Sequence, residues 1–153
     1  MDKADEARLR AILFALTEPR LDDPILRDKF ISYLQHESPL IVAEAVDSLR
    51  RQGDKAAVDQ ILGLRQHSSP YVHGSVLRFM AHLHSEKALP LLIEALRNPH
   101  FIVRENAADE LGQLGAVEAI PHLRPLLNDA HPDVRQAVQT AIEILESRPT
   151  DEK

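Results

Sequence analysis

The sequence predicts an all-α protein, a solenoid in which one helical hairpin is repeated along the chain. Three observations support this fold class. Apolar residues recur every 31 positions, as from Ile41 to Val72 to Val103, and Gly53 and Gly115 lie between two apolar sets within a repeat. The hydrophobic content is 44% but the aromatic content only 4%, so the core is aliphatic. A fixed period of roughly 20 to 50 residues is typical of repeat architectures, in which stacked neighbours bury the faces that one hairpin cannot.

The apolar columns define two helices in each repeat. Three columns lie four residues apart, on one face of a helix: Ile41, Val72, Val103 and Val134; Ala45, Val76, Ala107 and Val138; Leu49, Met80, Leu111 and Ile142. A second set marks another helix: Ala57, Ala88 and Ala119; Val58, Leu89 and Ile120; Ile61, Leu92 and Leu123. Gly53 and Gly115 lie between the sets, where a helix end favours a left-handed residue. Each repeat is therefore predicted as helix A, a tight turn, helix B and a short loop.

The first repeat, residues 3–35, is divergent. Residues 3–17 are predicted as its helix A, which Pro19 ends, and four residues share one face of that helix: Leu9, Ile12, Leu13 and Leu16. Asp23 and Pro24 form a cap and first-turn pair for a helix B that extends to about Gln35. This second helix is predicted to bury Leu26, Phe30, Ile31 and Leu34.

The later elements follow the period. Helices are predicted at 39–52 and 54–66, 70–84 and 86–97, and 101–114 and 117–128, so the repeats span 38–66, 69–97 and 100–128. A last helix, 132–146, has polar outward positions that suit a cap, and 147–153 is predicted to be a disordered tail. Residues 1–146 are thus predicted as one domain. Pro125 should kink its helix B. The third repeat departs most from the pattern, at Gly74, at Phe79 and at His84, which replaces the turn glycine.

The repeat resembles the HEAT-like repeats of phycobilin lyases and of many bacterial proteins. The residues that carry the resemblance are His131-Pro132-Asp133-Val134-Arg135, Val103-Arg104, Ala107-Ala108, Leu111-Gly112, Leu114-Gly115 and Ala119-Ile120-Pro121. The resemblance implies a right-handed, armadillo-like solenoid whose B helices line the concave side. It also implies that Arg104 and Arg135 pack between repeats and pair with a carboxylate. Such repeats serve many roles, so the resemblance indicates the fold and not the function.

Composition excludes several functions. The formal net charge of −6 argues against a nucleic-acid binder, which would normally carry a basic stripe. The chain lacks the long apolar run that a membrane span needs, and its acidic start lacks the regions of a secretory signal. Because cysteine is absent, there is no thiolate nucleophile or Cys-ligated metal. We expect a cytoplasmic protein, no membrane contact and a monomer.

The exposed side of the B helices is the predicted binding surface. Its first half is polar, with Asp28, Lys29 and Ser32 followed by Asp59, Gln60 and Gly63. Its second half is an apolar strip of Pro90, Leu91, Pro121 and Pro125 with a rim of Glu94, Arg97 and His122. An apolar strip with a charged rim suits a protein or peptide partner. The structural alternative is that Pro90 and Pro121 belong to the repeat consensus and only shape helix B.

The eight histidines do not form a predicted metal site. His36 and His67 are one period apart in loops, as are His100 and His131, and stacked helices place such positions about 10 Å apart. Among HEAT-like proteins, the enzyme deoxyhypusine hydroxylase uses His-Glu pairs early in its A helices, after a Val-Arg, for a di-iron site. The matching positions here hold Gly74-Ser75, Glu105-Asn106 and Gln136-Ala137, and the His36-Glu37 pair falls in a loop. We therefore predict no such activity and no metal.

These observations predict a non-catalytic scaffold or adaptor that binds a protein or peptide and needs no cofactor. The alternative is an assistant in cofactor attachment, of the phycobilin-lyase type, although aromatic residues that could stack on a tetrapyrrole are scarce. A third alternative is a nucleic-acid reader, like the HEAT-like alkylation-repair glycosylases, which the net charge disfavours. No phosphate-binding glycine loop or nucleophile elbow is present.

Overall fold

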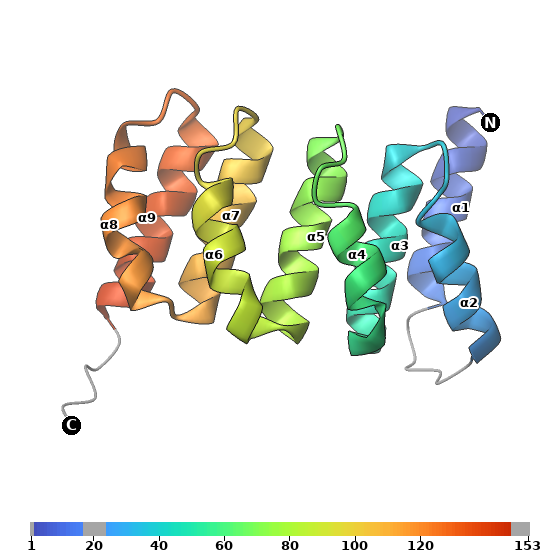
Figure 1. The fold of residues 1–153 in the computed structure, drawn as a ribbon. Helices are drawn as coiled ribbons and strands as arrows, with labels where there is room; N and C mark the ends of the chain where they lie inside the picture. Colours follow the sequence, from blue (N-terminus) through green and yellow to red (C-terminus); the bar gives the residue numbers. More distant parts are fainter. Residues whose placement is uncertain (1, 17–23, 148–153) are drawn as a thin grey trace. The chain divides into compact units, whose positions relative to one another are not determined.

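The computed structural model describes residues 2–16 and 24–147, and every regular element in those residues is a helix (Figure 1). The described chain divides into two compact units, Met1–His84 and Ser85–Lys153. Several predictions lie outside the described residues: the end of the first helix at 17, the stop at Pro19, the cap at Asp23 and the tail from residue 148.

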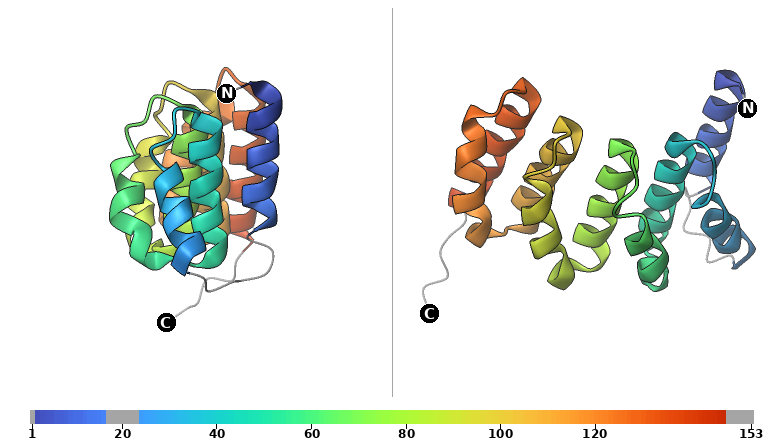
Figure 2. Two further views of the ribbon diagram at one scale, coloured as in Figure 1. Left: turned by 90° about the vertical axis from the view of Figure 1, so that its right-hand side faces the viewer. Right: turned by 45° about the horizontal axis from the view of Figure 1, so that its top comes forward.

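The first unit has two layers of helices. Helices α1 (Lys3–Ala15), α3 (Pro39–Gln52) and α5 (Pro70–Leu83) pack side by side in one layer. Helix α2 (Pro24–Tyr33) packs on α3, and α4 (Val58–Gly63), preceded by the 3-10 turn η1 (Lys55–Ala57), packs on α5. Figures 1 and 2 show α2 and α4 covering the same side of the first layer.

The second unit repeats this arrangement. Helix α7 (Phe101–Leu114) packs along α9 (Pro132–Glu146), and α6 (Ser85–Ala95) packs on α7. The last helix B is broken into η2 (Val117–Ala119), α8 (Ile120–Leu123) and η3 (Arg124–Asn128), and it packs on α9. Helix α9 is the predicted capping helix, with the predicted bounds.

The core is made of the predicted columns. Every residue of the three helix-A columns is buried, as are the first and third columns of helix B, while the middle column of Val58, Leu89 and Ile120 is half-buried. Burial of aliphatic side chains on a helix face provides the main stabilisation, roughly 25 cal/mol per Å² of apolar surface. The constant spacing of these residues thus sets which side of each helix faces inward.

Two of the turns use the predicted glycines. Gly53 and Gly115 end α3 and α7 in the left-handed conformation, with φ of 73° and 77°, which costs little only for glycine. His84 ends α5 differently, with φ of −138°. Its ring bonds the Lys55 carbonyl through Nε2 at 3.1 Å and stacks on Phe79, so this turn is held by a side chain instead of a left-handed residue.

Three predictions about elements need correction. The helix predicted at 54–66 begins as a 3-10 turn and ends at Gly63. The helix predicted at 117–128 is broken, because Pro125 has no N–H to continue the α-helical hydrogen bonds, and the chain continues as the 3-10 helix η3. On the predicted apolar face of α1 only Leu13 is fully buried, while Ile12 is 54% and Leu16 38% exposed.

Candidate interaction surface

The predicted apolar strip lies on the outer layer of the second unit. Helix α6 packs on α7 and the α8–η3 segment packs on α9, and both lie on the same side of the α7–α9 layer (Figures 1 and 2). Pro90, Pro121 and Pro125 are exposed, and Leu91 is half-buried. The structure therefore brings the four apolar residues of the prediction onto one layer.

The three prolines occupy different positions in their helices. Pro121 is in the first turn of α8 and Pro125 in that of η3, where a missing N–H costs little. Pro90 lies inside α6, where it cannot donate to the carbonyl of Glu86. Each ring is exposed, so these residues add rigid apolar surface without loss of side-chain entropy.

Charged residues border the strip. Glu94, Arg97 and His122 are exposed, as predicted for the rim. Arg124 of η3 donates to Glu146 at the end of α9 at 2.8 Å, and both side chains are at least half exposed. This ion pair joins the broken helix B to the capping helix.

Two apolar residues were missed by the prediction. Val117 is 47% and Leu127 40% exposed. Leu127 is one repeat after the buried Leu96, so the period alone predicts burial. The 3-10 helix turns about 120° per residue instead of 100°, so the side chain rotates outward after Pro125. Pro125 was the sequence signal for this change.

The polar half of the predicted surface belongs to the first unit. Lys29 lies on α2 with its ammonium 5.1 Å from the centre of the Tyr33 ring, and Gln60 is exposed on α4. Asp28, Ser32, Asp59 and Gly63 are also exposed. These residues lie on the helix-B layer of their own unit.

The loop histidines act as hydrogen-bond acceptors. His36 and His67 accept from the backbone N–H of Ser38 and Ser69 through Nδ1, each at 3.0 Å. One and two repeats later the same position holds Asn98 and Asp129, which accept from the residue two positions on at 2.9 Å. A side chain that accepts from the backbone two residues later fixes a turn. These positions therefore shape the loop before each A helix.

His100 and His131 have a different role. Each is the N-cap of an A helix, and its Nδ1 accepts from the N–H of Ile102 or Asp133 at 3.3 Å. The His131 ring also stacks on Phe101, with 3.6 Å between ring centres. Capping satisfies N–H groups that the helix leaves without partners. All four loop histidines thus have local structural functions.

Arg104 clasps two consecutive loops of the second unit. Its Nε and Nη2 donate to the two carboxylate oxygens of Asp129, both at 2.8 Å, and Nη1 donates to the carbonyls of Asn98 and Pro99. This confirms the predicted pairing with a carboxylate. The Arg104 bond holds the pKa of Asp129 below its usual value.

Arg135 only partly follows the prediction. It donates to the carbonyls of Asp129 and Ala130, as Arg104 does one repeat earlier, and these bonds hold its own loop. The structure shows no carboxylate bond for it among the described residues. Both arginines thus bind the carbonyls of the preceding loop, and Arg104 in addition pairs with the carboxylate of Asp129.

A family comparison decides what this repeat is. The model of HEAT repeats matches residues 60–143, more than half of the chain. The chain belongs to the HEAT-repeat family. The Gly115 turn and the Arg104 clasp lie within the matched residues and are therefore parts of HEAT repeats.

Solved structures share this fold. The complex of CpcE and CpcF of phycocyanin lyase from Nostoc is similar with a TM-score of 0.70 and 22% identity, over 97% of this chain and 63% of that one. A designed armadillo repeat protein in complex with the peptide (KR)4 is similar with a TM-score of 0.58 and 16% identity, over 94% of this chain and 77% of that one. Both likenesses concern the fold.

A curated relative is an enzyme. The deoxyhypusine hydroxylase of Cryptococcus neoformans is 30% identical over 102 residues, which is 64% of this chain and 28% of that protein. The chain thus spans under a third of the enzyme's length. The positions compared with His-Glu pairs in the sequence analysis hold Glu105-Asn106 in α7 and Gln136-Ala137 in α9. His36-Glu37 lies in the loop before α3.

No three metal-binding side chains converge anywhere in residues 2–16 and 24–147. Within the same ranges, no helix has the length and hydropathy of a membrane span.

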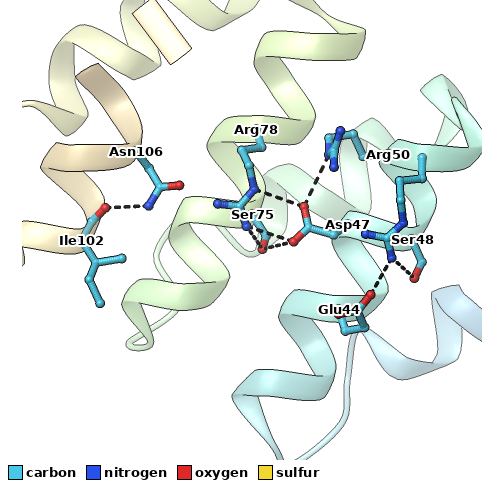
Figure 3. A network of polar contacts seen from close by, with 9 residues as sticks. Glu44, Asp47, Ser48, Arg50, Ser75, Arg78, Ile102 and Asn106 are labelled. Carbon is cyan, nitrogen blue, oxygen red and sulfur yellow. Dashed lines mark hydrogen bonds and ion pairs between the residues drawn. The ribbon is translucent and has the colours of Figure 1, made fainter. Parts of the chain in front are cut away.

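An ionic network joins two HEAT repeats of the first unit (Figure 3). Asp47 of α3 accepts from Arg78 and Ser75 of α5, both at 2.9 Å, and from Arg50 at 3.4 Å. Asp47 and Arg78 occupy the same position in consecutive repeats. Burial alone would raise the pKa of Asp47, but the hydrogen bonds and charge of Arg78 outweigh it, so the pKa lies below its usual value.

The second unit carries acidic residues on its helix-A layer. Burial, and then repulsion by Asp109 and Asp133, raises the pKa of Glu105. Burial also raises the pKa of Asp109. These carboxylates lie apart from the predicted binding strip, which is on the helix-B layer. Burial is thus the main cause of both raised pKa values, and repulsion by neighbouring carboxylates adds to it at Glu105.

Proposed function

We propose that this HEAT-repeat protein is a non-catalytic scaffold that binds a protein or peptide on the α6 and α8–η3 surface of its second unit. The observation that supports this most is that Pro90, Pro121 and Pro125 are exposed and Leu91 is half-buried on the helix-B layer of one unit. Apolar surface of this kind with a polar rim is typical of interfaces between proteins.

The partner would meet a surface that is already ordered. Prolines hold the backbone of α6 and η3, and the Arg124–Glu146 ion pair joins η3 to α9. A preformed surface loses little conformational entropy on binding. Glu94, Arg97 and His122 would then favour partners that place complementary charges at the rim.

Substitution of Leu91 tests this proposal. Leu91→Asp places a charge in the strip, whereas Gln139→Asp places the same residue on the exposed side of α9. Quantitative mass spectrometry after affinity purification from the native host should show a partner retained by the wild-type chain and by Gln139→Asp but lost with Leu91→Asp. Circular dichroism should show equal helicity for all three. A partner that Leu91→Asp retains would contradict the assignment of the surface.

The likeness to the phycocyanin lyase complex supports a second candidate, an assistant in bilin attachment. Incubation of the chain with a bilin separates the two functions. A stoichiometric shift of the bilin absorbance would favour the second candidate, while an unchanged spectrum favours the scaffold. The cytoplasmic location expected from the sequence belongs to the scaffold proposal, and cell fractionation tests it.

A further inference from the structure

Helix α1 is held to the first unit by little buried surface. Within Lys3–Ala15, Leu13 alone is buried, and the helix packs along α3. The last helix of the described chain, α9, buries six side chains: Val134, Ala137, Val138, Ala141, Ile142 and Leu145. Because burial of apolar side chains provides most of the stabilisation of a packed helix, α1 is bound more weakly than α9.

Arg10 makes the packing of α1 less favourable. Its Nε atom is buried and has no hydrogen-bond partner among the described residues. A buried donor without an acceptor loses the hydrogen bond that water would give it, and the loss is larger for a charged group. The packed position of α1 therefore includes an unfavourable contribution that disappears when water reaches Arg10.

Two polar contacts oppose the release of α1. The Ser38 hydroxyl, directly before α3, donates to Glu6 Oε2 at 2.6 Å. The Arg51 guanidinium of α3 lies 4.9 Å from the centre of the Phe14 ring, and Phe14 is 49% exposed. A cation–π contact at such an exposed position is weak, and water can replace the hydrogen bond of the hydroxyl. These contacts therefore set the position of α1 more than they add to its stability.

The side of α3 that contacts α1 keeps its own polar pairs without that helix. Arg51 also donates to the Glu44 carboxylate and to the Ser48 hydroxyl, and both residues belong to α3. Loss of the Phe14 contact therefore leaves Arg51 paired, so the charge penalty that usually follows when one partner is removed does not arise. The packing of α3 with α5 is also independent of α1.

We propose that α1 is a strap that opens as one unit while α2, α3, α4 and α5 stay folded. Elements with few buried apolar contacts open at a lower free energy than the domain as a whole. The open state uncovers Ser38 and the Arg51 side of α3, so a partner that contacts this side binds only that state. The strap controls access to the first unit, whereas the proposed scaffold surface lies on the second, so each inference can fail alone.

Native-state hydrogen exchange of the full chain, measured by NMR, tests whether the strap opens as a unit. The amides of residues 9–14 should share one protection factor, at least about 10-fold below that of residues 45–49 in α3. Protection that rises steadily from residue 9 to residue 14 would show fraying from the end of the helix. Amides of α1 that exchange as slowly as those of α3 would show unfolding of the whole unit. Either result would overturn the proposal.

Replacing the arginine with the buried Nε should close the strap. Arg10→Met puts an apolar group in place of the donor without an acceptor, so protection in α1 should rise about 5-fold. The matched control is Arg8→Met, because the Arg8 side chain is 80% exposed, and its protection should stay at the wild-type level. An equal rise in both variants, or no rise with Arg10→Met, would contradict the role of Arg10.

Replacing the aromatic ring should open the strap. Phe14→Ala should lower protection in α1 about 2- to 5-fold relative to Ile12→Ala, with α3 and α5 unchanged. Ile12 is the matched control because it lies on the same helix and is 54% exposed, against 49% for Phe14, and both substitutions gain a similar helix propensity. A loss of protection that extends equally through α3 and α5 would show that α1 does not open on its own.

Discussion

Single side chains hold the loops of this chain, and they do so at fixed positions of the repeat. His36, His67, Asn98 and Asp129 differ in chemistry, yet each accepts a hydrogen bond from the backbone two residues later. What the position requires is an acceptor at the right distance. This explains why histidine in the earlier repeats can occupy the position that Asn98 and Asp129 hold in the later ones.

Arg104 should be sensitive to conservative substitution. Arg104→Lys keeps the charge but loses the two-pronged contact with Asp129 and the bonds to the Asn98 and Pro99 carbonyls. The Arg104 and Asp129 side chains are only 15% and 10% exposed, so we expect a loss of about 2 kcal/mol in the free energy of unfolding, measured in urea.

Arg135→Lys is the matched control, because Arg135 occupies the same position one repeat later but is exposed. Its substitution should cost less than about 1 kcal/mol. Equal losses for the two variants would show that the Asp129 contact contributes little.

Asp47 should make the free energy of unfolding depend on pH in the acid range. Its pKa in the folded protein lies below the usual 3.8, so the folded state binds this proton more weakly than the unfolded state. The stabilisation is therefore complete above about pH 4 and is lost as the pH falls through the lower folded-state pKa. Asp47→Asn should be less stable than the wild-type chain at pH 7, and the difference should shrink toward zero in the acid range. Urea titrations at several pH values measure it, and a difference that grows in acid would contradict the assignment.

At the scale of elements, α7 and α9 are in contact at their backbones. A Cβ atom built on Gly112 would lie 3.0 Å from the Ala141 Cα and 3.1 Å from its Cβ. Gly112→Ala should therefore destabilise the protein by about 1 to 2 kcal/mol, although alanine favours the helix, because two packed backbones must separate. Thermal or urea unfolding measures the change.

Gly63 in α4 provides the opposite case. No atom lies within 4 Å of a Cβ built there, so Gly63→Ala should stabilise by about 0.4 to 1 kcal/mol. For the Gly112→Ala variant of the previous prediction, a higher free energy of unfolding would mean that α9 moves away from α7 at little cost in packing.

Helix bounds were predictable where residues mark both ends. Helices α3 and α7 match the prediction because a left-handed glycine ends each of them, and α3 also begins at a proline. The prediction was wrong for α4, which begins after the 3-10 turn η1, and for α8, after which the chain continues as a 3-10 helix at Pro125. It was also incomplete for α1, because period alone cannot say whether a neighbouring element covers a terminal face.

The candidate surface was predictable in a similar way. The positions of Pro90, Pro121 and Pro125 on the outer side follow from the period, which also places the core. The exposure of Leu127 does not follow from the period but from the 3-10 turn after Pro125, the residue that signalled this change in the sequence. Partner identity does not follow from period or exposure, because repeats of this kind present many chemistries on one backbone.

For the whole molecule, the contacts join elements that are near one another in the sequence. Repeat proteins of this kind are stabilised by terms within repeats and between nearest neighbours. Leu111 in α7 and Leu49 in α3 are repeat equivalents, and both are 0% exposed. Replacing either leucine with alanine should cost about 2 to 5 kcal/mol.

Hydrogen exchange should show which helices lose stability in each variant. Leu111→Ala should speed exchange most in α7, α8 and α9, while α1 and α2 keep their protection, and Leu49→Ala should show the reverse pattern. Identical profiles for the two variants would indicate that the two compact units unfold as one.

The Arg104 clasp has a consequence for building longer chains. Both of its halves, together with one complete loop, fall inside the segment 99–129, whose last carboxylate occupies the position of Asn98. If residues 99–129 were duplicated in tandem, each added repeat would bring its own Arg104 clasp. Engineers could lengthen the protein hairpin by hairpin without designing new junctions.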